Sequence, residues 1–148
     1  MEKALVRILR EGGARVRENV TLYDAGVEVD PADGRNVEIV ATGLPIFQGI
    51  PAAIDTTMVS PLHCDGSAFP RADRRAGVAL GRARAAKEDV YPELLDGSRL
   101  RLLVAAVEVG GRMNRELKQL LVICVFSALS QIRNRFRAAL PECGETDG

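Results

Sequence analysis

Four segments of the chain carry the pattern of apolar and polar positions that β-strands show. In the first segment, Val16, Val20 and Leu22 alternate with polar residues that include Arg15, Arg17 and Thr21, which predicts a strand. The last segment is a near-continuous apolar run, which is typical of a central strand covered on both faces. The predicted strands span residues 14–23, 36–42, 50–59 and 99–109.

Three other segments have apolar residues at helical spacing and predict helices over residues 2–11, 73–95 and 112–140. Gly12-Gly13 ends the first helix. The second is rich in Ala and Arg, and two glycines weaken its first half. The third is long and amphipathic. Its apolar stripe consists of Leu117, Leu121, Cys124, Ala128 and Ile132.

The elements follow one another as helix, three strands, helix, strand and helix. This order predicts an α/β protein with a central mixed β-sheet flanked by helices and a long C-terminal amphipathic helix. A chain of 148 residues is one domain by length. We expect a core over residues 1–115, a C-terminal helix over residues 112–140 packed on that core, and a flexible tail over residues 141–148.

Two of the predicted strands contain a carboxylate within an apolar run, Glu38 in the second strand and Asp55 in the third. Acidic side chains are rarely buried unless a partner compensates their charge. Two carboxylates about 4 Å apart repel by on the order of 4 kcal/mol at an effective dielectric constant of 20. A divalent cation bound between them would remove that repulsion. The alternative places both on the solvent face of an edge strand, and the flanking Val37 and Ile39 favour this for Glu38.

Lys87 interrupts the apolar stripe of the second helix, which also contains Leu80, Ala83, Tyr91 and Leu94. A lysine at such a position can extend its ammonium group into water while its stem stays buried. It can instead reach the two carboxylates and stabilise charge that develops on a phosphate. Both interpretations stay open at the level of sequence.

Two other acidic residues are candidates for the same site. Glu108 ends the last strand and is expected either to cap the following helix, to pair with Arg112, or to support the site indirectly. Glu18 in the first strand could add a further carboxylate. The adjacent residues His63 and Cys64 predict no zinc site, because neighbouring side chains rarely converge on one ion.

The net charge is zero, with 20 basic and 20 acidic residues, so the whole molecule has no electrostatic attraction to nucleic acid. A local basic cluster nevertheless precedes and enters the second helix, and it contains one acidic residue, Asp73. It is either a solvated helix surface or a surface that faces phosphates. Its basic residues are Arg71, Arg74, Arg75, Arg82, Arg84 and Lys87.

Cysteine usage and the absence of an export signal predict a nuclear or cytoplasmic protein that is not secreted. The three cysteines, Cys64, Cys124 and Cys143, are widely spaced and form neither a metal-ligand pattern nor a disulfide framework. The longest apolar stretch, residues 120–129, is about half of the ~20 residues that a membrane span needs. We therefore expect no membrane partner.

These residues resemble the PD-(D/E)XK restriction-endonuclease-like fold, and more closely the C-terminal endonuclease of site-specific non-LTR retrotransposons. Arg35-Asn-Val-Glu38 stands where that family has its Arg-Pro-Asp strand, and Ile54-Asp55-Thr-Thr matches the second motif. Ala86-Lys87-Glu-Asp-Val-Tyr91 matches its lysine-tyrosine helix, and residues 103–111 resemble its last strand. The similarity covers residues 2–115. Thr57 occupies the position of the usual lysine, so the relocated Lys87 would supply that function.

The resemblance implies a metal-dependent endonuclease that hydrolyses phosphodiester bonds in DNA and derives from a retrotransposon. Glu38 and Asp55 would bind Mg²⁺ or Mn²⁺, Lys87 would act on the attacking water or on the phosphate, and Tyr91 would place Lys87. The DNA backbone would be held by Arg71, Arg74, Arg75, Arg82 and Arg84.

Two other functions are compatible with the same sequence. The first is a catalytically inactive interaction or dimerisation module, a fragment of a mobile element, whose C-terminal helix binds a second copy or a larger mobile-element protein. Val122, Ile123 and Phe126 widen the apolar face of that helix. The second is a DNA-repair or Holliday-junction nuclease of the same superfamily, which would share the site chemistry.

Overall fold

The computed structural model describes residues 1–72 and 74–139. The elements appear in the order predicted from the sequence, with two short 3₁₀ turns between them. They are α1 (Glu2–Glu11), β1 (Arg15–Thr21), β2 (Asn36–Thr42), η1 (Phe47–Gly49), β3 (Ala52–Val59), α2 (Val78–Val90), η2 (Pro92–Leu94), β4 (Arg101–Glu108) and α3 (Arg115–Ala139).

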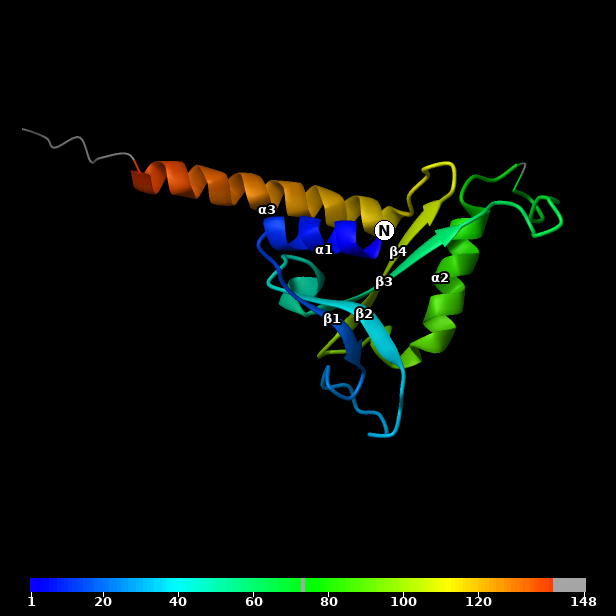
Figure 1. Cartoon of the computed structure of the whole chain (residues 1–148), viewed down its shortest axis with the longest axis horizontal. Helices are drawn as coiled ribbons and strands as arrows, with labels where there is room; N and C mark the ends of the chain where they lie inside the picture. Colours follow the sequence, from blue (N-terminus) through cyan, green and yellow to red (C-terminus); the bar gives the residue numbers. More distant parts are fainter. Residues whose placement is uncertain (73, 140–148) are drawn as a thin grey trace, which may run out of the picture.

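The strands form one mixed sheet in the order β1-β2-β3-β4, which confirms the predicted α/β class (Figure 1). The pairs β1–β2 and β2–β3 are antiparallel, and the pair β3–β4 is parallel. A parallel neighbour requires a crossover connection, and α2 lies within it. Because of this crossover, α2 lies across one face of the sheet.

The sheet separates two hydrophobic clusters. Ala52 and Ile54 of β3 belong to the cluster that is covered by α1 and α3, whereas Ala53 belongs to the cluster covered by α2. This alternation follows from the two-residue period of a strand, so Asp55 also faces α2. Among the described residues, no helix combines the length and apolarity needed to cross a membrane.

The second helix is shorter than predicted. α2 begins at Val78, not at residue 73, because Gly77 adopts a left-handed conformation (φ 80°) that ends the preceding loop. Residue 73 itself lies outside the described residues. The helix ends at Val90 because Pro92 disfavours helical geometry in the residue before it, and a 3₁₀ turn follows.

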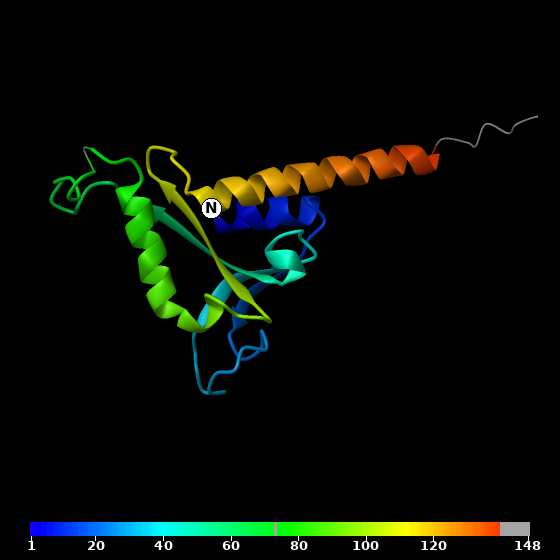
Figure 2. The same ribbon diagram turned by 180° about the vertical axis from the view of Figure 1, so that it is seen from behind.

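α3 packs on the core over its first half and then extends beyond it (Figures 1 and 2). Leu117, Leu120 and Cys124 are buried against α1 and β4. A Cβ atom on Gly12, at the end of α1, would lie 3.2 Å from the Cα of Cys124, so the two helices approach closely there. The amphipathic stripe predicted for this helix is wrong at Ile132, which is 49% exposed.

The start of α3 is fixed by Asn114. Its Oδ1 accepts a hydrogen bond from the backbone N–H of Leu117 at 3.0 Å, which is the geometry of a helix N-cap. The same side chain joins the helix to β4, because its Nδ2 donates to the carbonyl of Val104 at 2.6 Å. The helix therefore begins at Arg115 instead of residue 112. The predicted flexible tail, residues 141–148, lies outside the described residues.

We expect Asn114→Ala to lower the free energy of unfolding by about 2 kcal/mol, because it removes a helix cap and leaves a strand carbonyl without its donor. Urea denaturation followed by circular dichroism measures the change. Asn134→Ala, at an exposed position of the same helix, is the matched control and should leave the midpoint nearly unchanged. Equal midpoints for the two variants would show that Asn114 does not secure α3.

Candidate functional site

The sheet is irregular around Glu38. In the described part of the chain, the β2–β3 ladder ends at the pair Ile39–Ile54, so the next two residues, Glu38 and Asp55, are adjacent in register but not paired. The β1–β2 ladder also omits the pair that Asn19 and Glu38 would form, and Asn19 has a φ of 50°. Asn tolerates this conformation better than most residues, and such backbone outliers cluster at functional sites.

The Glu38 carboxylate bonds to β3 where the ladder has opened. Its Oε2 accepts hydrogen bonds from the backbone N–H of Thr56 at 2.9 Å and from the Thr56 hydroxyl at 2.6 Å. β2 and β3 are both interior strands. The alternative that placed these carboxylates on an edge strand facing solvent is therefore wrong.

Asp55 is the most deeply buried acidic residue among those described, with 1% of its surface exposed. Its Oδ1 lies 2.7 Å from the Nζ of Lys87. Charge is compensated by this ion pair, yet Oδ1 is buried and accepts no well-aligned hydrogen bond within the described residues. The carboxylate has lone pairs besides the one that faces the Lys87 ammonium, and these could bind a cation or a water molecule.

Lys87 reaches Asp55 from α2, on the face of the sheet that this helix covers. Its side chain is 31% exposed, so the ammonium group stands between the buried carboxylate and the solvent. Of the two interpretations of Lys87, the structure agrees with the one in which the ammonium group reaches a carboxylate. A bound phosphate could approach this group from the solvent side.

Tyr91 lies close to Asp55 and is itself buried. Its hydroxyl donates a hydrogen bond to the carbonyl of Asn36 at 2.7 Å. Burial, followed by the negative charges of Asp55 and Glu38, raises the pKa of Tyr91 to about 12. The phenol is thus protonated at neutral pH, where it can donate a hydrogen bond but cannot act as a base.

Arg35 fastens the end of α2 to the start of β2. Its guanidinium bonds to Asp33 at 2.6 Å, to Glu93 at 2.7 Å and to the carbonyl of Val90. These bonds hold the residues on either side of Tyr91. Hydrogen bonds from Arg35 keep the pKa values of Asp33 and Glu93 below their usual range. In the sequence Arg35 stands out only as part of a motif, and no local pattern indicates its contact with Glu93, 58 positions away.

The two remaining acidic candidates lie elsewhere. Glu108 is buried and pairs with Arg112 at 3.3 Å, which is one of the roles expected for it. Glu18 pairs with Arg10 at 2.7 Å on the exposed side of β1 and α1. The expectation that Glu18 would join the carboxylates is therefore wrong, because its side chain is already paired with α1.

Four of the five predicted phosphate-binding arginines line two hollows at the start of α2. Arg71, Arg75 and Arg82 line the first, and Arg82 also stacks over the ring of Phe69 at 4.6 Å. Arg74 lies in the turns that precede α2. Arg84 lines the second hollow and pairs with Glu88 at 3.0 Å and with Glu116 at 3.1 Å, so its charge is largely compensated.

Three basic residues outside the predicted phosphate-binding cluster share the hollow of Arg84. Arg112, Arg115 and Lys118 come from the loop before α3 and from its first turns. Their three-residue spacing directly after Gly110-Gly111 is the signal that could have identified them. The hollow has a volume of about 450 Å³.

The donor atoms at the site suit a small, hard cation. Mg²⁺ is commonly held by one or two carboxylates together with water and substrate phosphate, which Glu38 and Asp55 could supply. No group of three or more His, Cys, Asp and Glu side chains converges in the part of the chain described here, so an all-protein metal cage is not present in it. No protein-family model and no curated protein matches this chain.

We expect removal of Lys87 to destabilise the fold more than removal of the Asp55 charge, because the exposed ammonium can turn to water and the buried carboxylate cannot. Lys87→Met should cost on the order of 2 kcal/mol, less than for a fully buried pair because Lys87 is partly exposed. Asp55→Asn should cost less. In the double variant most of the loss should be recovered, as a double-mutant cycle in urea would measure. Strictly additive losses would contradict the pairing.

The Arg35 contacts predict a stability change in acid. Because the folded-state pKa values of Asp33 and Glu93 are lowered, their contribution is present above about pH 4, the ordinary carboxyl range, and is lost as the pH falls further. Arg35→Met should therefore lower stability at neutral pH, and its difference from the unaltered chain should shrink below about pH 4. Thermal melts from pH 2 to 7 test this. Arg7→Met, which breaks an exposed helix pair, is the control.

Proposed function

We propose that this protein is a metal-dependent nuclease that hydrolyses phosphodiester bonds in DNA. The observation that carries the proposal is the buried carboxylate of Asp55, with Lys87 at 2.7 Å and with Glu38 on the next strand at the adjacent register position. The mixed sheet, in which α2 connects the two parallel strands β3 and β4, is consistent with a restriction-endonuclease-like fold. A nuclear or cytoplasmic location follows from the proposed substrate.

Glu38 and Asp55 are the residues that would hold Mg²⁺ or Mn²⁺. Carboxylate oxygens are the preferred ligands of these ions, and a bound ion would share the Asp55 carboxylate with the Lys87 ammonium, which lies 2.7 Å from Oδ1. The bound ion would polarise the scissile phosphate and lower the pKa of water. Glu38 is held by both donors of Thr56 through one oxygen, so its carboxylate is fixed in position before any ligand binds.

Lys87 is the proposed catalytic cation of the protein itself. A phosphate at the carboxylates would lie beside its ammonium group, which would neutralise the charge that develops on the phosphate oxygens. Pairing with Asp55 keeps the ammonium in place in the absence of substrate. The ammonium group is partly exposed, so DNA could contact it without a rearrangement of the core.

Tyr91 and Arg35 are positioning residues in this proposal. Tyr91 follows Lys87 by one helical turn, and its hydroxyl is anchored to β2 at Asn36. Arg35 fixes the adjoining backbone through Val90 and Glu93. Together they hold the end of α2 against the sheet, so that Lys87 remains above Asp55.

DNA is the proposed substrate because basic side chains surround the start of α2, about two turns from Lys87. Arg71, Arg75 and Arg82 line one hollow there. Contacts of this kind neutralise backbone phosphates without reading sequence, so binding should weaken steeply as salt is added.

The test is cleavage of supercoiled plasmid and of labelled duplex DNA by the purified chain in Mg²⁺ or Mn²⁺, with EDTA as the metal-free control. We expect no detectable cleavage with Asp55→Asn or Glu38→Gln, and a loss on the order of 10²–10³-fold with Lys87→Met, because one charge that stabilises the transition state is removed. Mn²⁺ titration calorimetry should show binding that Asp55→Asn abolishes.

Glu18→Gln is the matched control, because it neutralises a carboxylate of a neighbouring strand outside the site. It should retain full activity and metal binding. Cleavage that persists in EDTA, or that Asp55→Asn leaves undiminished in a correctly folded protein, would overturn the proposed function. Absence of both cleavage and Mn²⁺ binding in the unaltered chain would also overturn it.

A further inference from the structure

α3 carries a second apolar stripe that the core does not cover. Its members are between 49% and 69% exposed, and they follow one another at intervals of three, four, three and four residues. They are Val122, Val125, Leu129, Ile132 and Phe136. We call these five residues the outer seam of α3.

Alternating intervals of three and four residues are the pattern of coiled-coil positions a and d. A single helix that packs on a globular core needs one apolar stripe, and α3 already has it in Leu117, Leu120 and Cys124. The outer seam is therefore a second stripe, and its regular spacing suits another helix better than an irregular surface. Phe126, which is 66% exposed, widens the seam on one side.

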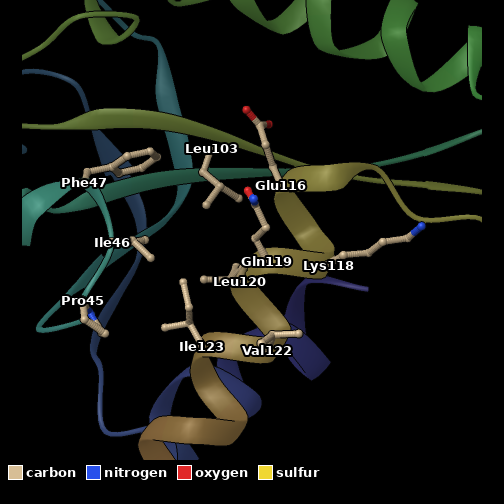
Figure 3. A pocket seen from close by; sticks show the side chains of 10 residues that line it. All are labelled: Pro45, Ile46, Phe47, Leu103, Glu116, Lys118, Gln119, Leu120, Val122 and Ile123. Carbon is tan, nitrogen blue, oxygen red and sulfur yellow. The ribbon is translucent and has the colours of Figure 1, made fainter.

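An apolar hollow adjoins the N-terminal end of the outer seam (Figure 3). It lies between α3 and the segment around η1, and its volume is about 530 Å³. Pro45, Ile46 and Phe47 form one wall, and Ile123 of α3 points toward them from the opposite side. Val122 also lines the hollow but projects away from that wall. Val122 thus belongs both to this hollow and to the outer seam.

We propose that the outer seam binds the outer seam of a second copy of this chain, with the two α3 helices antiparallel and Leu129 on the two-fold axis. Phe136 is seven residues beyond Leu129, and Val122 is seven residues before it. At about 1.5 Å per residue, each lies roughly 10 Å from the axis, so Phe136 of one copy lies opposite Val122 of the other. Its ring then enters the hollow beside Val122.

The charges on α3 favour the antiparallel arrangement. Arg133, Arg135 and Arg137 are clustered near the C-terminal end, so a parallel pair would bring six guanidinium groups together. In the antiparallel pair these arginines lie at opposite ends of the interface. The helix dipoles also oppose each other favourably in this orientation.

The buried area is consistent with a dimer only if the hollow takes part. Six apolar side chains at about half to two-thirds exposure supply on the order of 600 Å² per copy, whereas a stable interface needs roughly 800 Å² per partner. Entry of Phe136 into the hollow supplies further apolar area on both copies. This inference is independent of the proposed nuclease function, because none of its residues belongs to the Asp55 site.

Analytical ultracentrifugation of the full chain tests the association. We expect a dimer in the micromolar range, and at least a hundredfold weaker association for Leu129→Glu, which places two carboxylates together on the axis. Ser130→Glu is the matched control on the neighbouring, polar position and should remain dimeric. Leu129 is 55% exposed, so urea unfolding of Leu129→Glu, measured below the dissociation constant, should show an intact monomer fold.

The orientation is tested by oxidative cross-linking in a background in which Cys64 and Cys143 are replaced by Ser. Leu129→Cys should form an intermolecular disulfide, whereas Phe136→Cys should not link to its own counterpart across the two-fold axis. Cross-linking of Phe136→Cys alone would overturn the antiparallel arrangement. A monomer at all concentrations would overturn the proposal, and co-sedimentation of that monomer with anionic lipid vesicles would assign the outer seam to a membrane surface instead.

Discussion

The arrangement of this molecule around its candidate site depends on one constraint, a carboxylate buried within an interior strand. Asp55 lies in an interior strand with 1% of its surface exposed, so its charge must be compensated from the face of the sheet. The parallel pairing of β3 and β4 supplies the means, because it requires a crossover and thereby carries α2 across that face. Lys87 then meets Asp55 without any further adjustment of the chain.

The proposed function would account for this ion pair better than stability alone does. Buried ion pairs are commonly neutral or unfavourable compared with well-packed apolar residues, so stability alone gives little reason to place Asp55 there. The neighbouring strand β2 also loses stabilisation, because Glu38 is paired in neither the β1–β2 nor the β2–β3 ladder. Two local costs at adjacent register positions, with the carboxylate of Glu38 held in place by Thr56, are the pattern expected where a ligand supplies the missing stabilisation.

Sequence periodicity could predict the elements but not the contacts that join them. Strand patterns located Glu38 and Asp55, yet their adjacency depends on the β2–β3 register, which periodicity does not contain. Helical spacing placed Lys87 and Tyr91 on one stripe, whereas the choice between solvent and Asp55 was decided by the crossover. The Arg35–Glu93 contact joins residues 58 positions apart and left no local pattern.

For α3, the sequence alone does not show which apolar residues contact the core. A helix with apolar residues on two sides presents overlapping stripes, and the sequence alone does not say which stripe faces the core. Ile132 was assigned to the core-facing stripe by spacing, but the core ends near Cys124 and leaves it exposed. The stripe that continues past this point has the stricter coiled-coil interval. The outer seam exposes apolar side chains, which lowers solubility, and it keeps regular spacing over two heptads. A helical partner explains both features better than incomplete burial does.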